Sequence, residues 1–161
     1  MPRGGDHEFR GSTPVLRVVQ THLMSDSGRY PQATPRAGLR ALVVDDHLDA
    51  AESLATFLDY VGVDSRTAMD GQEALAVATE WQPDIGIFDL HMPGIDGAEL
   101  ARQIRAQTWK SRPLLIAVTG WSDRGRESAL SSGFDHWAQK PVEPMALVQM
   151  IQGYFQLGPS P

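Results

Sequence analysis

Cysteine is absent from this chain of 161 residues, which excludes disulfide bonds, thiolate metal sites and cysteine nucleophiles. The sequence also has no run of about 18 apolar residues, so no membrane-spanning segment is expected. The N-terminus lacks a basic start followed by an unbroken apolar stretch, the pattern of a secretory signal. We therefore expect a cytoplasmic protein with no membrane partner.

Positive charge is scarce in most of the chain. Residues 1–38 contain five arginines and three acidic residues, whereas residues 39–161 contain nine basic and seventeen acidic residues, a net charge of −8. Binding to a nucleic-acid backbone needs a basic face, so this charge argues against a nucleic-acid-binding domain. It favours a bound cation or a basic partner.

The composition divides the chain into three parts. Residues 1–38 are dominated by Gly, Pro, Ser, Thr and Arg, which predicts a disordered leader because little apolar surface can be buried there. Residues 39–156 form the predicted domain. Residues 157–161 form a short disordered tail.

Within the domain, short apolar runs alternate with segments of helical period. The strands are predicted at residues 41–44, 63–68, 85–88, 114–118 and 135–138. The last two helices are expected near 124–131 and at 144–154. Alternating strands and helices predict an α/β fold with a parallel sheet and right-handed crossovers. In such sheets, ligands bind beyond the carboxyl ends of the strands.

Polar side chains follow four of these strands. Asp45 and Asp46 come after the first strand, Asp89 after the third, Thr119 after the fourth and Lys140 after the fifth. Since parallel strands end at one edge of the sheet, these side chains are expected to converge. Clustered carboxylates repel one another unless a cation neutralises them, and oxygen ligands suit Mg2+.

This set of groups favours phosphoryl transfer. One carboxylate can act as the nucleophile and form an acyl phosphate. The cation and Lys140 can neutralise the phosphoryl oxygens, and the hydroxyl of Thr119 can donate a hydrogen bond to one of them.

Four motifs, in order and at matching spacing, resemble bacterial response-regulator receiver domains over about residues 39–155. They are Leu42-Val43-Val44-Asp45-Asp46, Phe88-Asp89-Leu90-His91-Met92-Pro93-Gly94-Ile95-Asp96-Gly97, Val118-Thr119-Gly120 and Gln139-Lys140-Pro141. The resemblance implies a doubly wound, flavodoxin-like sheet of five strands in the order 2-1-3-4-5.

The resemblance also assigns roles to residues. It implies that Asp89 is the phosphoacceptor, with Lys140 and Thr119 as its catalytic partners. Asp46, Asp89 and the backbone carbonyl of His91 would bind Mg2+ directly, and Asp45 would act through a water molecule.

Further positions of the family concern switching and the lifetime of the phosphoryl group. The switch residues would be Thr119, Gly120 and Trp137, the last at a position where Tyr or Phe is more usual. The residues that tune the lifetime would be His91 and Trp121, and we expect the bulky Trp121 to shield the acyl phosphate from water.

We therefore expect a phosphoacceptor protein of a two-component system or phosphorelay. A histidine kinase or a phosphotransfer protein would supply the phosphoryl group. The downstream protein would bind the face formed by the helix near 124–131, the strand at 135–138 and the helix at 144–154. The chain is expected to be stand-alone, without an output domain, similar to receivers at the ends of hybrid kinases. It would be a monomer or weak dimer and catalyse only its own phosphorylation and dephosphorylation.

Other interpretations remain open. A phosphorylation-independent binding module on the same fold is the main alternative, although such modules often lack an acid or the lysine. A phosphatase with an aspartyl nucleophile needs a second acid two residues later, where this chain has His91. A zinc site of His47, His91 and His136 is disfavoured because these residues lie on different loops without metal-ligand spacing.

Overall fold

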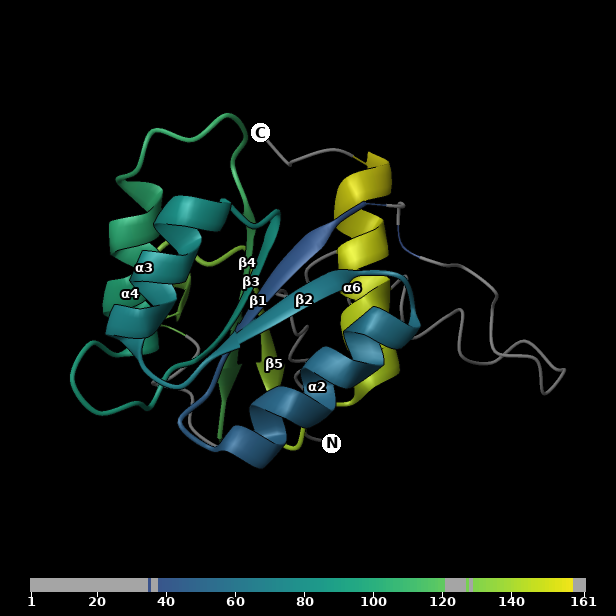
Figure 1. Ribbon diagram of the computed structural model, residues 1–161, viewed down its shortest axis with the longest axis horizontal. Helices are drawn as coiled ribbons and strands as arrows, with labels where there is room; N and C mark the ends of the chain where they lie inside the picture. Colours follow the sequence, from purple (N-terminus) through teal and green to yellow (C-terminus); the bar gives the residue numbers. More distant parts are fainter. Residues whose placement is uncertain (1–34, 36–37, 121–126, 128, 158–161) are drawn as a thin grey trace, which may run out of the picture. The chain divides into compact units, whose positions relative to one another are not determined.

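The computed structural model describes residues 35, 38–120, 127 and 129–157 (Figure 1). A sheet of five parallel strands has the order β2-β1-β3-β4-β5, as predicted. The strands are β1 (Arg40–Val44), β2 (Asp64–Ala68), β3 (Ile85–Asp89), β4 (Leu114–Thr119) and β5 (His136–Gln139). The doubly wound α/β fold is thus confirmed.

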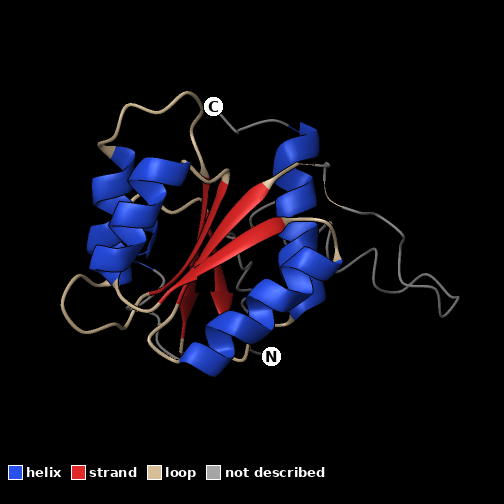
Figure 2. Cartoon of the chain, in the orientation of Figure 1, coloured by secondary structure: helices blue, strands red, loops and turns tan. Residues whose placement is uncertain are grey.

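Helices cover both faces of the sheet. They are α2 (Leu48–Tyr60), α3 (Gly71–Trp81), α4 (Gly97–Arg105) and α6 (Pro144–Leu157). Figure 1 and Figure 2 show α2 and α6 on one side of the sheet and α3 and α4 on the other. Residues 127 and 129–131 are helical too, within the helix predicted near 124–131.

The central strands are buried on both faces. Every residue of β3 and β4 is buried, as their continuous apolar runs predict for parallel strands between two helical layers. Phe88 and Leu100 belong to the core beneath α3 and α4, whereas Leu58 and Ile151 belong to the core beneath α2 and α6. The more polar β2 is an edge strand in which exposed and less exposed residues alternate.

Two helices begin with an aspartate whose side chain caps the helix N-terminus. The side chain of Asp70 accepts a hydrogen bond from the backbone N–H of Glu73 at the start of α3. Asp96 accepts one from Glu99 at the start of α4 in the same way. Each carboxylate satisfies a backbone donor that has no partner inside its helix. By contrast, the N-cap of α2 is His47, whose side chain makes no capping hydrogen bond.

Several predicted boundaries differ from the observed ones, and β1, β3 and β4 are each one residue longer than predicted. The second strand begins at Asp64 rather than residue 63, because the backbone N–H of Val63 donates to the carbonyl of Leu58 and closes the turn after α2. The fifth strand is shifted by one residue, to His136–Gln139. Helix α6 extends beyond residue 154 to Leu157, and Phe155 packs against the core beneath it.

The predicted leader and tail fall almost wholly outside the described residues, so both stay predictions. Among the residues that the structure does describe, no helix is both long and apolar enough to cross a bilayer.

Candidate functional site

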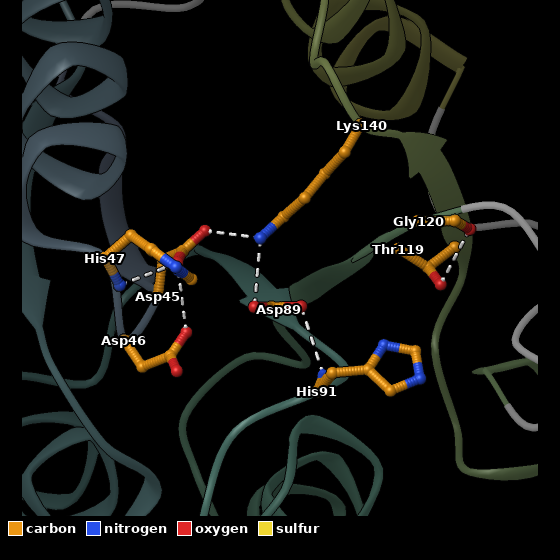
Figure 3. Close-up of polar contacts among 8 residues, drawn as sticks. All are labelled: Asp45, Asp46, His47, Asp89, His91, Thr119, Gly120 and Lys140. Atoms are coloured by element: carbon orange, nitrogen blue, oxygen red, sulfur yellow. Dashed lines mark hydrogen bonds and ion pairs between the residues drawn. The ribbon is translucent and has the colours of Figure 1, made fainter.

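Figure 3 shows most of the predicted site residues at the carboxyl end of the sheet: Asp45, Asp46, Asp89, His91, Thr119, Gly120 and Lys140. Asp89 and Thr119 are the last residues of β3 and β4, and Lys140 directly follows β5. The strand register fixes this arrangement, because Asp89 pairs with Val118 and Thr119 pairs with Gln139. Parallel pairing therefore brings together residues that lie far apart in the sequence.

Lys140 joins two of the three carboxylates. Its ammonium nitrogen lies 2.9 Å from Oδ2 of Asp45 and 2.9 Å from Oδ2 of Asp89. The two aspartates are buried, whereas the lysine side chain is 33% exposed. A charge-assisted hydrogen bond to each carboxylate offsets part of the cost of removing these charges from water.

The pKa values of Asp45 and Lys140 reflect the same balance between burial and hydrogen bonding. Burial by itself raises the pKa of Asp45, but hydrogen bonds from Lys140 and from the backbone of His47 outweigh burial and bring it below its usual value. Burial lowers the pKa of Lys140, but hydrogen bonds to Asp45 and Asp89 outweigh it and raise the value. Asp45 is therefore held as a carboxylate and Lys140 as an ammonium.

Asp89 has a defined set of partners. Its Oδ1 accepts a hydrogen bond of 3.1 Å from the backbone N–H of His91, while Oδ2 faces Lys140. The residue is only 4% exposed, but it borders a cavity of about 310 Å³ whose lining includes Asp45 and Lys140. The carboxylate is thus positioned on both oxygens and adjoins open space.

A glycine allows the loop after β3 to fold back onto the site. A Cβ atom at Gly97, the first residue of α4, would overlap the backbone carbonyl of Asp89. The helix can therefore approach the end of β3 this closely only without a side chain at that position.

The acidic end of the site has donor atoms that suit a divalent cation. Among the residues that the structure describes, Oδ1 of Asp46 is the buried side-chain oxygen without a hydrogen-bond partner. It lies 3.1 Å from Nδ1 of His47, although not in hydrogen-bond geometry. Donor atoms of Asp45, Asp46 and His47 lie within 4.8 Å of one another. An unpartnered carboxylate oxygen beside a second carboxylate fits Mg2+, which prefers oxygen ligands.

The other predicted site residues make fewer contacts with the carboxylates and Lys140. The hydroxyl of the buried Thr119 donates to the carbonyl of Gly120 at 3.2 Å. A Cβ atom at Gly120 would meet nothing within 4 Å, so there is open space beside this position. Trp137 is half-buried and packs against the core beneath α3 and α4. Trp121 lies outside the described residues.

The sequence of residues 41–152 matches the response regulator receiver domain family. The chain belongs to this family. A 14.6 kDa uncharacterised protein of Leptolyngbya boryana is 33% identical over 119 residues, which cover 73% of this chain and 91% of that protein. The DNA-binding response regulator MtrA of Mycobacterium tuberculosis is 35% identical over 113 residues, 70% of this chain. The chain spans about half the length of MtrA, since the match covers 49% of it.

Solved structures show the same fold as this receiver domain. The chemotaxis protein CheY4 of Vibrio cholerae has a TM-score of 0.67 at 28% identity, with 73% of this chain and 98% of CheY4 covered. The receiver domain of Ssk1 from Saccharomyces cerevisiae, solved with the histidine phosphotransfer protein Ypd1, has a TM-score of 0.68 at 27% identity, with 77% and 93% covered. The chain is thus a receiver domain of the two-component response-regulator type, a class of phosphoacceptor domains.

One residue beside the receiver site was missed by sequence reasoning. In the sequence, His47 enters only as part of a zinc site with His91 and His136, which the spacing of the three histidines disfavours. Its place directly after Asp45 and Asp46 was the available signal, but only the structure shows its ring turned toward both carboxylates.

Proposed function

We propose that this receiver domain accepts a phosphoryl group on Asp89 from a histidine kinase or a phosphotransfer protein. The observation that carries the proposal is the position of Lys140, whose ammonium nitrogen bridges Asp89 and Asp45 at 2.9 Å. A nucleophilic carboxylate and a fixed positive charge are thereby held side by side.

The reaction forms one bond and breaks another. A carboxylate oxygen of Asp89 attacks the phosphorus atom of the donor phosphohistidine, and the P–N bond breaks as the imidazole leaves. Lys140 is already in contact with Oδ2 of Asp89, so its ammonium can follow the phosphoryl oxygens with little movement. Such transfers depend mainly on positioning and on neutralising charge.

The residues for a divalent cation are Asp46 and Asp89, the backbone carbonyl of His91, and Asp45 through a water molecule. Bound Mg2+ neutralises charge on the phosphoryl oxygens. The unpartnered Oδ1 of Asp46 supports this role, because a buried carboxylate oxygen without a partner is otherwise costly.

Phosphorylation then changes the charge beside Thr119. The new group adds about −1.5 to −2 charges. The Thr119 hydroxyl must leave the carbonyl of Gly120 to reach it, at a cost of about 1 kcal/mol for one hydrogen bond. Movement of Trp137 would follow and alter the face formed by the helix predicted near 124–131, β5 and α6. A nearly complete switch needs about 5.5 kcal/mol of differential stabilisation.

We further propose that this face binds a downstream protein or that the domain passes its phosphoryl group onward. The chain would catalyse only its own phosphorylation and dephosphorylation, in the cytoplasm. We propose that it acts as a monomer or weak dimer.

Incubation with acetyl phosphate and Mg2+ tests the proposal. Intact mass spectrometry should show one added phosphoryl group on the wild type and none on Asp89→Asn. Asp96→Asn is the matched control, because Asp96 is exposed in the same loop and Asn is an equally good N-cap. An unmodified wild type, or equal labelling of Asp89→Asn, would show that Asp89 is not the phosphoacceptor.

A further inference from the structure

His47 lies at the start of α2 with its imidazole turned toward the acidic end of the site (Figure 3). Its Nδ1 is 3.2 Å from Oδ1 of Asp45 and 3.1 Å from Oδ1 of Asp46. The side chain is 75% exposed, so burial does not force the ring into this position. A nitrogen donor therefore adjoins two carboxylate oxygens.

The spacing of these atoms matches that of ligands on one metal ion. Bonds of about 2.1 Å at right angles place neighbouring ligands of an octahedral ion about 3.0 Å apart. The two distances from Nδ1 of His47 are close to that value, and one of the oxygens is the buried, unpartnered Oδ1 of Asp46. Nδ1 of His47 and Oδ1 of Asp46 can thus share an ion, with a carboxylate oxygen of Asp45 within 4.8 Å of both.

The side chain of His47 does not cap α2, although His47 is the N-cap residue of that helix. A helix N-cap side chain normally accepts a hydrogen bond from a backbone N–H in the first turn, but His47 makes no such bond. Instead its backbone N–H donates to Oδ1 of Asp45 at 2.9 Å, which fixes the aspartate and the histidine relative to each other. Nδ1 of the ring also lies within hydrogen-bonding distance of Oδ1 of Asp45, at 3.2 Å, and in the tautomer protonated at Nε2 its lone pair can bind an ion instead.

The other nearby imidazole is differently placed. Figure 3 shows the ring of His91 on the Thr119 side of Asp89, away from Asp45 and Asp46. Its contact with the site is the hydrogen bond from its backbone N–H to Asp89. The nitrogen donor for an ion at the acidic end is therefore His47.

We propose that Nδ1 of His47 is a direct ligand of the divalent-cation site, so that this receiver domain binds transition ions such as Zn2+ and Ni2+ more tightly than Mg2+. This inference rests on the proposed cation site of the preceding section. Imidazole nitrogen suits Zn2+, Ni2+ and Co2+, whereas Mg2+ prefers a shell made only of oxygen. The identity of residue 47 then sets which ion occupies the site.

Calorimetric titration with Ni2+ and with Mg2+ tests the inference. The protein is the full chain carrying His7→Gln and His22→Gln, which removes the imidazoles of residues 1–38. In His47→Gln the ratio of the Ni2+ to the Mg2+ affinity should fall at least tenfold. His47→Asn should show the same loss, and it keeps α2 intact because Asn is a favourable N-cap.

A second readout identifies the ligand atom. In protein labelled with 15N-histidine, Zn2+ should shift the Nδ1 resonance of His47, assigned by its absence from His47→Gln, while Mg2+ should leave it in place. An unchanged affinity ratio in both variants, or a Zn2+-insensitive Nδ1 resonance, would overturn the inference. A ratio that falls in His91→Gln instead would assign the nitrogen to His91 and also overturn it.

These measurements are independent of phosphorylation. No phosphodonor is present in the titrations, so a domain that cannot be phosphorylated still gives an affinity ratio. Conversely, labelling of Asp89 in Mg2+ together with an unchanged ratio would leave the proposed function standing and remove the role of His47.

Discussion

The ammonium nitrogen of Lys140 lies 2.9 Å from Oδ2 of Asp89, although 50 residues separate the two along the chain. The same nitrogen contacts Asp45, so one positive charge serves two buried carboxylates. In the absence of a divalent ion, this lysine is the cation that holds the site together.

Replacing Lys140 with Met should therefore destabilise the metal-free domain. Two buried carboxylates lose their shared partner, but the lysine is one-third exposed and water screens part of the interaction. The expected loss is about 1–3 kcal/mol in the free energy of unfolding. Urea unfolding at pH 7 with a chelator measures it.

Mg2+ should then stabilise Lys140→Met more than the wild type, because the ion relieves the same repulsion. Lys110→Met is the control, since Lys110 is exposed and distant in sequence from the site. Equal stability of wild type and Lys140→Met in the chelator would contradict the role assigned to the ammonium.

Two glycine substitutions should act in opposite directions. Gly97→Ala places a methyl group onto the carbonyl of Asp89, so α4 must move and about 1–3 kcal/mol of stability should be lost. Phosphorylation by acetyl phosphate should slow as well, because the carbonyl belongs to Asp89, the proposed phosphoacceptor. Gly153→Ala in α6 meets nothing within 4 Å and should stabilise by up to about 1 kcal/mol.

Thermal unfolding and intact mass spectrometry of both variants check this pair. Gly153→Ala controls for a general effect of alanine on the helices. A Gly97→Ala variant with wild-type stability and labelling rate would mean that the loop moves without cost.

The fold was predictable because its signals are local. The continuous apolar runs of β3 and β4 indicate strands buried on both faces, and the helical periods between strands imply parallel pairing. The convergence of Asp45, Asp89 and Lys140 then follows from topology alone. Their individual contacts do not, because a carboxylate at a strand end can turn toward a lysine, a backbone N–H or an ion with similar energy.

No pattern in the sequence predicts the contacts at the amino ends of the strands, opposite the candidate site. Arg105 and Asp135 are 30 residues apart, and neither belongs to the four motifs of the site. Thr119 illustrates the same limit, since its expected role gave no reason to predict a hydrogen bond to Gly120. Pairings of this kind depend on side-chain rotamers in the packed domain, which composition and period do not specify.

The contact between Arg105 and Asp135 leads to a stability prediction. Arg105 is 17% exposed and donates to Asp135 and to the carbonyls of Gly133 and Pro113 at 2.7–2.8 Å. Arg105→Met removes this donor from both carbonyls, whereas Asp135 keeps Arg112 and the backbone N–H of Leu115. The substitution should cost about 2–4 kcal/mol. Arg102→Met removes a mostly exposed pair with Glu99 and should cost less than about 1 kcal/mol.

Urea unfolding of the two arginine variants at pH 7 separates these cases. Similar losses in both would show that water replaces the guanidinium of Arg105, and the buried network would then contribute little.

His136 should make the stability of the domain depend on pH. Burial lowers its pKa because the imidazolium is poorly solvated in β5, and the charge of Asp135 offsets this only in part. Well above pH 6.5 the ring is neutral in the folded and unfolded chains alike. As the pH falls below 6.5, the unfolded chain takes up a proton before the folded chain does. The free energy of unfolding then decreases, by at most about 1.4 kcal/mol per pH unit for one proton.

The contribution of His136 is isolated by comparing the wild type with His136→Gln. Urea unfolding at pH 7.5 and pH 5.5 should show a larger loss on acidification for the wild type, because glutamine binds no proton in either state. An NMR titration of the His136 ring should give a midpoint below 6.5 in the folded protein. If the two proteins lost the same stability between these pH values, another group would be responsible for the acid sensitivity.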